Sequence, residues 1–448
     1  AFCICVGNVI LRAMNVKSLI KKAIPTGVFT AVEPLGHLGE AVLLNTINGF
    51  PAKGMKVIGV TGTNGKTTTS FMIHRMLVDA GYKNVGLMTT VAYGIGEDIR
   101  PQIHHMTNVP VGELMQRLKW MKSQGVEWLV LETTSHALAQ HRVWGVPYSV
   151  AVMTNVTHEH LDYHKTFERY RDAKRMMFKL ANANKRGLRV GIVNAEDPSA
   201  ELFASDVAKP ITYGVGKGDV QATNVQMTPD GSTYTVRVGN DEYAIKCNIP
   251  GSFNVSNSLA VVCVGRALGL SREQIEHGIA ALTSVEGRMT NIEEGQDYSV
   301  IVDFAHTPDS FEKLFKDLRP VVKGKLIAMF GSAGRRDEAK RAVQGELAGK
   351  YCDEVIVTEE DDRDIDGIEI MNQIAGGAEK AGKLRDKDLF LVHDRTEAIS
   401  FAISRASAGD TVILLGKGHE KTIERADGEH DWDEIGTAHS AVRARLNK

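Results

Sequence analysis

Residues 59–71, GVTGTNGKTTTSF, combine glycines, one lysine and several hydroxyl side chains in a pattern that suits the binding of phosphate. Glycines allow successive backbone N–H groups to point inward at an anion, and the positive end of a helix that starts there strengthens the attraction. Lys66 adds a full positive charge, and Thr67 can offer its hydroxyl to the magnesium ion that accompanies a nucleoside triphosphate. We therefore predict that the phosphates of ATP bind to Gly62, Thr63, Asn64, Gly65, Lys66, Thr67 and Thr68.

The segments on either side of this loop predict a strand before it and a helix after it. The run 55–58 contains β-branched residues, and apolar residues follow the loop at helical spacing as far as Gly81. The strict phosphate-loop motif has glycine where this chain has Val60, so a glycine-rich turn before an ordinary helix is the alternative interpretation. Gly-Lys-Thr at a strand-to-helix junction favours a triphosphate site, because the binding mechanism requires that context.

Two further expected strands end in side chains that could bind a metal ion. The strand at 128–131 is followed by Glu132, and the strand at 150–153 is followed by the histidines of NVTHEHLDYH. Ligands of an open α/β sheet collect at the carboxyl ends of parallel strands, so these side chains should lie beside the phosphate-binding loop. A carboxylate, an imidazole and the Thr67 hydroxyl are suitable ligands for magnesium or manganese. We predict that the histidine ligand is His160, and we interpret His158 and His164 as surface or turn residues.

Composition and charge exclude several classes of function. The chain has 448 residues, enough for about two or three domains, and its net charge of −2 gives no support to nucleic-acid or anionic-membrane binding. No run is apolar enough to cross a membrane, so we expect a cytoplasmic protein without membrane insertion. The cysteines Cys3, Cys5, Cys247, Cys263 and Cys352 have no metal-binding spacing, and we expect them to be free thiols that serve packing.

Apolar runs alternate with helical patterns along most of the chain, which predicts an α/β fold with mostly parallel sheets. We expect a short helical segment at 1–53, a central ATP-binding domain at 54–286 and a Rossmann-like C-terminal α/β domain at 287–448. Alternating residues between 207 and 250 predict a small antiparallel portion, and Ser271 to Gln274 form a capping box that predicts the start of a helix. The C-terminal strands are expected at 299–302, 325–329, 354–357, 389–392 and 411–415.

Several stretches of the chain together resemble the motifs of the Mur ligase family. They are GTNGKTTT, LETTSHALAQHR, NVTHEHLDYH, RYRDAKRMMF, GSFNVSNSLAV, VEGRM, VDFAHTPDS and GKGHE. Their order and spacing are most similar to the UDP-N-acetylmuramoyl-tripeptide synthetase branch of that family. The resemblance implies ATP-driven amide synthesis: the γ-phosphate passes to a substrate carboxylate, the amine of an amino acid attacks the acyl phosphate, and phosphate leaves. The family also carries the loop without the first glycine, which accounts for Val60.

The resemblance also implies roles for individual residues. Lys66, Glu132, His160 and Lys174 would be catalytic, with Lys174 carbamylated so that it can hold a second metal ion beside the magnesium bound by Thr67, Glu132 and His160. The residues that would close the C-terminal domain over the nucleotide are Asn254, Asn257, Arg288, Asp303 and His306. Those that would hold the sugar-peptide acceptor are Thr107, Pro110, Ser135, Gln140 and Arg142, although Asn108 and Val109 break the usual Thr-Thr-Pro. Those that would hold meso-diaminopimelate are Arg336, Asp361, Arg363, Gly416 and Glu420.

Two departures from the family pattern leave the substrates open. The usual Asp-Asn-Pro-Arg is Glu-Asp-Asp-Arg at 360–363, so an acidic loop could equally suit lysine, ornithine or another cation. Residues 1–53 do not read as a full UDP-binding domain, so the acceptor could lack UDP, as in folylpolyglutamate or cyanophycin synthetases. A nucleotide-binding subunit without catalysis is a third interpretation. In every case the expected partners are small molecules, and we expect a monomer.

Overall fold

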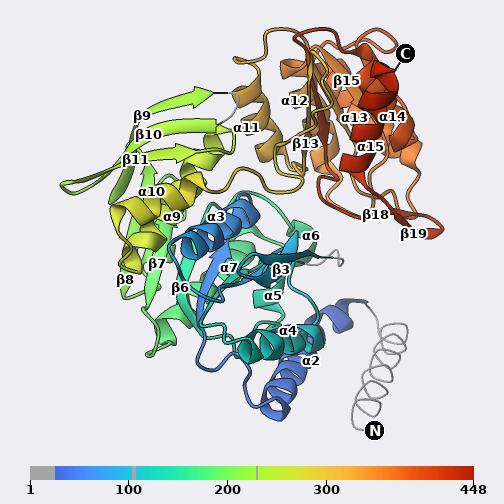
Figure 1. Cartoon of the computed structure of the whole chain (residues 1–448). Coiled ribbons are helices and arrows are strands. Elements are labelled where there is room, and N and C mark those ends of the chain that lie inside the picture. The colour runs from blue at the N-terminus through green and yellow to red at the C-terminus, as the bar shows by residue number, and fades with distance from the viewer. Residues whose placement is uncertain (1–25, 103–106, 229–230, 448) are drawn as a thin grey trace.

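The computed structural model describes residues 26–102, 107–228 and 231–447 (Figure 1). The first 25 residues of the helical segment expected at 1–53, with Cys3 and Cys5, lie outside these ranges. The described chain begins with α2 (Thr26–Ile47), which lies within that expected segment. This helix packs against α4 (Val111–Ser123) at the bottom of the view in Figure 1.

A large, mostly parallel sheet forms the centre of the first unit. In the described part of the chain it has eleven strands, in the order β11-β10-β9-β8-β7-β6-β1-β5-β2-β3-β4. Its middle strands are parallel and almost entirely buried, as expected for a sheet covered by helices on both faces. The strands predicted at 55–58, 128–131 and 150–153 are confirmed as β1 (Lys56–Thr61), β5 (Trp128–Glu132) and β6 (Tyr148–Met153). The other strands of this parallel part are β2 (Gly86–Met88), β7 (Val190–Asn194) and β8 (Lys209–Val215).

Helices cover both faces of this sheet and bury one apolar core on each. One face packs against α3 (Lys66–Asp79), α9 (Ser252–Ala267) and α10 (Arg272–Ala280). The other face packs against α4, α5 (Ser135–Ala139), α7 (Phe167–Ala183) and α8 (Ala200–Ala204). The capping box predicted from Ser271 to Gln274 is confirmed at the start of α10.

Antiparallel strands extend the sheet at both ends. At one end are β9 (Val220–Thr228), β10 (Gly231–Val238) and β11 (Asp241–Cys247), and at the other end are β3 (Ala92–Ile95) and β4 (Asp98–Pro101). The antiparallel prediction for the region from 207 was wrong for β8, which pairs in parallel with both β7 and β9. The reason is the loop between the two strands, in which Gly216 and Gly218 have positive φ. This loop returns the chain to the level of Tyr213, and β9 then runs from Val220 in the same direction as β8.

A second sheet forms the C-terminal unit, in the order β12-β13-β17-β14-β15-β16. All of its pairings are parallel except that of the short β12 (Thr290–Asn291). The predicted C-terminal strands are confirmed as β13 (Ser299–Asp303), β14 (Leu326–Phe330), β15 (Glu354–Val357), β16 (Leu389–Leu391) and β17 (Thr411–Leu415). The covering helices are α11 (Pro308–Leu318), α12 (Ala339–Tyr351) and α13 (Gly367–Lys380) on one face, and α14 (Arg395–Arg405) and α15 (Glu434–Leu446) on the other. A separate hairpin is formed by β18 (Thr422–Arg425) and β19 (Gly428–Asp431).

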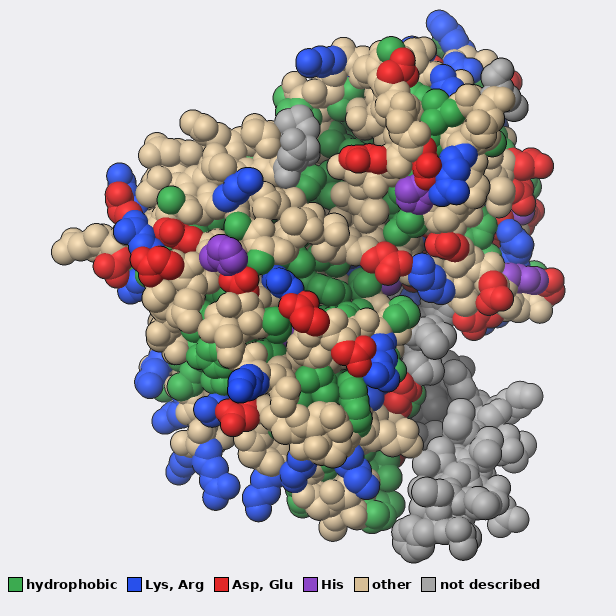
Figure 2. Space-filling model, in the orientation of Figure 1, with side chains coloured by type: hydrophobic (Ala, Val, Ile, Leu, Met, Phe, Trp, Pro, Cys, Tyr) green, Lys and Arg blue, Asp and Glu red, His purple; other side chains and the backbone are tan. Residues whose placement is uncertain are grey.

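The described residues agree with the expectations drawn from composition. Cys247, Cys263 and Cys352 are free and buried, as predicted for packing residues. Figure 2 shows acidic and basic side chains interleaved over the C-terminal unit, in keeping with the nearly balanced net charge of −2. Among the described helices, none combines the length and the apolar character that a membrane crossing needs.

Candidate active site

The phosphate-binding loop, residues 62–65, joins β1 to α3 as predicted. Gly62 has φ of +152° and Gly65 has φ of +82°, a region that residues with side chains rarely adopt. A Cβ atom at Gly62 would lie 1.9 Å from the Thr154 hydroxyl oxygen, and one at Gly65 would lie 2.3 Å from the amide oxygen of Asn257. Both positions therefore require glycine.

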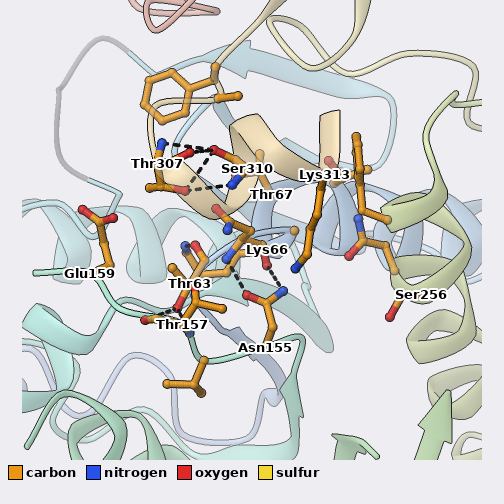
Figure 3. A pocket seen from close by; sticks show the side chains of 18 of the residues that line it. Thr63, Lys66, Thr67, Asn155, Thr157, Glu159, Ser256, Thr307, Ser310 and Lys313 are labelled. Carbon is orange, nitrogen blue, oxygen red and sulfur yellow. Dashed lines mark hydrogen bonds between the residues drawn. The ribbon is translucent and has the colours of Figure 1, made fainter. Parts of the chain in front are cut away.

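Side chains at the end of β6 hold this loop in shape. The Thr154 hydroxyl donates a hydrogen bond to the carbonyl oxygen of Asn64 at 2.6 Å. Asn155 brackets the same residue, since its amide oxygen accepts from the N–H of Asn64 at 2.9 Å and its amide nitrogen donates to the carbonyl at 3.0 Å (Figure 3). The hydroxyls of Thr63 and Tyr170 lie 2.9 Å apart. The loop is thus pre-organised, so binding phosphate requires little rearrangement of its backbone.

Glu132 ends β5 directly beside the loop and is buried. Its two carboxylate oxygens accept from the Thr67 hydroxyl at 3.2 and 3.0 Å. They also accept from the hydroxyl of Thr90 at 3.1 Å and from its backbone N–H at 3.0 Å. A carboxylate beside a threonine hydroxyl is a hard oxygen donor set that fits magnesium.

Two lysines contact the carbonyl groups of the same loop. Lys66 is the first residue of α3 and donates from Nζ to the carbonyl of Thr63 at 2.9 Å. Lys174 on α7 is 2% exposed and donates to the carbonyl of Gly62 at 2.7 Å, with its Nζ 4.4 Å from the centre of the Tyr170 ring. Burial lowers the pKa of Lys174 well below its ordinary value, and the charge of Lys66 lowers it further. The Lys174 amine is therefore much more readily neutral and nucleophilic than a surface lysine.

The histidines after β6 lie in different environments. His160 precedes α6 (Leu161–His164), and its ring centre lies 4.7 Å from that of His136. Burial lowers the pKa of His160 strongly and that of His136 to about 3, which favours the neutral imidazole that binds metal ions. His158 is exposed and stacks on Phe167, as its interpretation as a surface residue predicted. The same interpretation was wrong for His164, which is buried, because α6 turns it inward to within 3.0 Å of the Ser135 hydroxyl.

The C-terminal unit brings Arg288 to Thr67, one of the residues expected to bind the metal ion. Its Nη2 donates to the Thr67 hydroxyl at 3.3 Å, and its guanidinium lies 4.5 Å from the centre of the Phe304 ring. Asp303, at the end of β13, accepts from the backbone N–H groups of Met289 and Ala305 at 2.8 Å each. Asp303 therefore holds the backbone directly after Arg288 against the turn that follows β13, and the positive charge of Arg288 faces the loop where we expect phosphate to bind.

Further contacts join the phosphate-binding loop to the C-terminal unit. The Asn64 amide donates to the Asp309 carboxylate on α11 at 2.9 Å. Nearby, burial lowers the pKa of His306 to about 3, and its carbonyl oxygen accepts from Lys340 Nζ at 3.1 Å. In Figure 3 the side chain of Thr307, which caps α11, and those of Ser310 and Lys313 on α11 lie on the opposite side of the cavity from Asn155. The two units thus form the walls of one site.

The cavity between these walls has a volume of about 1000 Å³. It brings together most of the predicted residues, namely Thr63, Asn64, Gly65, Lys66, Thr67, Thr68, Thr107, Glu132, His160, Asn254, Asn257, Arg288, Asp303, His306, Arg336 and Glu420. The predicted residues outside its lining are Gly62, Pro110, Ser135, Gln140, Arg142, Lys174, Asp361, Arg363 and Gly416. Gly62 is the first residue of the loop, and Lys174 lies directly behind it, where its Nζ donates to the Gly62 carbonyl.

Three of the residues predicted to bind the amino acid, namely Asp361, Arg363 and Gly416, lie outside the cavity lining, near Lys417. Lys417 is fully buried, and its Nζ lies 2.9 Å from Asp361 and 2.6 Å from Glu420. Glu420 lines the cavity, so Lys417 connects the cavity wall to the loop 359–363. Arg363 in that loop forms an ion pair with Glu424 of the β18–β19 hairpin, in which Nε lies 2.5 Å from a carboxylate oxygen. Gly416 has φ of +103°, and a Cβ there would lie 2.7 Å from the Glu360 carboxylate.

Two of the residues predicted to hold the acceptor, Gln140 and Arg142, form a hydrogen-bonded group with Asn108 behind Glu132. Arg142 Nε donates to the Gln140 side chain at 2.9 Å, and its Nη1 donates to the carbonyl of Asn108. The Asn108 side chain donates to the carbonyl of Glu132 at 2.8 Å. Asn108, which departs from the family pattern, is therefore a support for the strand end that carries the carboxylate.

Sequence reasoning missed Thr90, Asn155 and Lys417. Asn155 directly follows a predicted strand, so the rule that ligands collect at strand ends could have found it. Thr90 follows the very short strand β2, which carries no clear periodic signal. Lys417 lay within a recognised motif, but its position between two carboxylates depends on residues far away in the chain.

A phosphate-binding loop that faces a second α/β unit across one cavity defines a nucleotide-dependent enzyme of the phosphate-loop class. Comparison with known proteins extends this assignment. The Mur ligase middle domain matches residues 60–265, and the Mur ligase, glutamate ligase domain matches residues 287–418. The chain is 40% identical over 421 residues to UDP-N-acetylmuramyl-tripeptide synthetase of Roseiflexus sp. (strain RS-1), with 91% of this chain and 82% of the relative covered. It therefore belongs to the Mur ligase family of ATP-dependent ligases.

Two further relatives are similar over most of their length. UDP-N-acetylmuramoyl-L-alanyl-D-glutamate–2,6-diaminopimelate ligase of Geobacillus thermodenitrificans (strain NG80-2) is 37% identical over 430 residues, which cover 95% of this chain and 86% of the relative. A solved structure of a UDP-N-acetylmuramoyl-L-alanyl-D-glutamate–2,6-diaminopimelate ligase is 29% identical and superposes with a TM-score of 0.61, covering 93% of this chain and 84% of that chain. These similarities confirm the resemblance identified from the motifs.

Proposed function

We propose that this protein adds a diamino acid, meso-diaminopimelate, to a UDP-N-acetylmuramoyl-L-alanyl-D-glutamate acceptor during the synthesis of peptidoglycan precursors. The relatives described above, named for this reaction, support the acceptor and the amino acid. The observation that carries the proposal is the single cavity of about 1000 Å³ in which the phosphate-binding loop faces Arg336 and Glu420. Nucleotide, acceptor carboxylate and incoming amine can meet there.

In the first step an oxygen of the acceptor carboxylate attacks the γ-phosphorus of ATP, the bond to ADP breaks, and an acyl phosphate forms. Phosphoryl transfer depends mainly on positioning and on neutralising charge. The backbone N–H groups of the loop 62–65 and the ammonium of Lys66 bind phosphate oxygens. Arg288, which reaches the Thr67 hydroxyl across the cavity, adds positive charge from the opposite wall. We assign nucleotide binding to residues 54–286 and the closure over the nucleotide to 287–448.

Magnesium would be held by Thr67, Glu132 and His160, and when bound it supplies a Lewis acid that neutralises the phosphate charge. The Thr67 and Glu132 oxygens lie within 3.2 Å of each other, and burial lowers the pKa of His160, which favours the neutral imidazole, so this set fits the ion. We assign Lys174 as a carbamylated residue that supports a second ion. Its amine is buried beside Lys66, where a second positive charge is unfavourable and a negative carbamate is favourable.

In the second step the amine of the amino acid attacks the acyl carbon, the C–N bond forms, phosphate leaves and the nitrogen loses a proton. Glu420 and Arg336 line the cavity at the C-terminal wall, where they can orient the ammonium and the carboxylate of the amino acid. Asp361 and Arg363 lie beside them, through Lys417. The acceptor residues Ser135, Gln140 and Arg142 act from behind Glu132, whereas Thr107 reaches the cavity itself.

The test is phosphate release from ATP and magnesium with the UDP-linked muramoyl dipeptide, in parallel with meso-diaminopimelate, L-lysine, L-ornithine or no amino acid. Release that requires both the dipeptide and meso-diaminopimelate is the expected result. The Lys66→Ala variant serves as the control for contaminating ATPase. Release with L-lysine or L-ornithine but not with meso-diaminopimelate would overturn the proposed amino acid. No release in any well despite ATP binding would overturn the proposed acceptor.

A further inference from the structure

The β18–β19 hairpin is joined to the loop 359–363 by two reciprocal ion pairs. Glu424 of the hairpin accepts from Arg363 Nε of the loop at 2.5 Å. Arg425 of the hairpin binds Glu359 of the loop with two hydrogen bonds, of 2.8 and 2.6 Å. Backbone contacts reinforce the pairing, since the N–H of Arg363 donates to the carbonyl of Glu424 at 3.1 Å. The hairpin thus lies over the loop that we assign to the amino acid.

The Arg363 guanidinium is already engaged on both of its hydrogen-bonding edges. A carboxylate binds an arginine most strongly through two parallel N–H groups, either Nε with Nη2 or Nη1 with Nη2. Here Nε donates to Glu424, and Nη1 donates to the carbonyl of Gly334 at 2.5 Å. The carboxylate of Asp361 lies 4.0 Å from Nη2. A carboxylate of a ligand can therefore gain a bidentate contact only by displacing a group that is already bound.

The two partners on these edges differ in kind. The Gly334 oxygen is neutral, whereas Glu424 carries a negative charge that repels a second carboxylate and attracts an ammonium. Glu424 is also the more accessible of the two carboxylates, because its side chain is 41% exposed, whereas that of Glu359 in the neighbouring pair is 2% exposed. The Arg425–Glu359 pair can therefore keep the hairpin in place when the charge of Glu424 is removed.

We propose that Glu424 is a specificity-determining residue, which occupies the Nε edge of Arg363 and so disfavours amino acids with a distal carboxylate relative to those with a distal ammonium alone. This inference rests on the proposed function, in that it takes Arg363 as part of the amino-acid site. Meso-diaminopimelate must displace Glu424 to reach Arg363, whereas L-lysine leaves the pair intact.

The test uses Glu424→Gln, which removes the charge and keeps the shape. Its matched control is Glu429→Gln, because Glu429 is an exposed glutamate directly opposite Glu424 in the hairpin register. The affinities of the full-length protein for meso-diaminopimelate and L-lysine are measured by titration calorimetry, and kcat/KM is measured for both in the phosphate-release assay. Thermal unfolding checks that each variant is folded.

We expect Glu424→Gln to raise the affinity ratio of meso-diaminopimelate to L-lysine about tenfold, a change typical of one charge-assisted contact. The same change is expected in the kcat/KM ratio, and Glu429→Gln should leave both ratios unaltered. An unchanged or lower affinity ratio in folded Glu424→Gln, or an equal rise in Glu429→Gln, would overturn the inference. Failure of wild-type turnover would count against the proposed function alone, because the calorimetric ratio reports on Glu424 without catalysis.

Discussion

Lys174 Nζ donates a hydrogen bond of 2.7 Å to the carbonyl oxygen of Gly62, which places a buried amine directly behind the phosphate-binding loop. Gly62 is also the residue whose missing side chain lets Thr154 approach the loop. A lysine more than a hundred residues away in the chain therefore contacts the same backbone turn that we assign to phosphate binding. The chemical state of this amine bears on the side chains that we assign to the metal ion.

Lys174→Ala should abolish activity, and short-chain carboxylic acids should restore part of it. If the lysine acts as a carbamate, a small carboxylate can enter the space left by the side chain and supply the missing negative charge. The measurement is phosphate release by the variant with formate, acetate or propionate, against chloride at equal ionic strength. Full activity of the variant without added acid would exclude the carbamate assignment.

Glu132→Gln should weaken magnesium binding, so that more magnesium is required, and should lower activity. We expect each effect to be at least about 10- to 100-fold, the range found when groups that support a metal ion are removed. The amide keeps an oxygen that can accept from Thr67 and Thr90, so the fold should survive while the negative charge is lost. Titration of magnesium in the phosphate-release assay checks this, with thermal unfolding as the control. The same magnesium dependence in variant and wild type would remove Glu132 from the metal site.

Arg363→Ala should raise KM for meso-diaminopimelate at least about tenfold and change KM for ATP little, because one charge-assisted contact is lost at the amino-acid site alone. Arg363→Lys should not restore the affinity, since an ammonium cannot reproduce the two-pronged contact of a guanidinium. Steady-state kinetics with each substrate varied in turn provide the measurement. Equal KM values for the amino acid in Arg363→Ala and wild type would place this arginine outside the site.

His74 should make the stability of the fold depend on pH. It is buried in α3 with Nε2 3.1 Å from the carbonyl of Val85, and burial lowers its pKa from 6.5 to about 4. The unfolded chain takes up a proton below pH 6.5 while the folded chain does not, so stability is fully present above pH 6.5 and is lost as the pH falls toward 4. The expected loss is about 3 kcal/mol.

The matched variant for this prediction is His74→Gln, whose amide can donate to the same carbonyl and cannot titrate. Urea unfolding between pH 4 and 7.5 should show a weaker decline in the variant than in the wild type. Identical pH profiles would show that another group causes the acid sensitivity.

The sequence by itself determined the parts of the site that depend on local pattern. The phosphate-binding loop needs glycines and a lysine within a few residues at a strand-to-helix junction, and this arrangement is visible in a single segment. Glu132 could be predicted because a carboxylate directly after a buried strand must lie at the ligand-binding edge of a parallel sheet. The capping box at Ser271 and the positions of most strands were likewise local.

Only the tertiary structure decided which distant side chains share a contact. Thr90 reaches Glu132 because β2 lies next to β5 in the sheet, and neither the short strand β2 nor its pairing with β5 was evident from periodicity. The parallel pairing of β8 depended on how a glycine-containing loop folds back, which alternation of residues does not encode. Arg363 was predicted to be available for a carboxylate, yet Glu424, 61 residues further along, occupies its Nε edge. Hydrogen bonds of this kind form only after separate segments have packed together, so their partners are set by the whole fold.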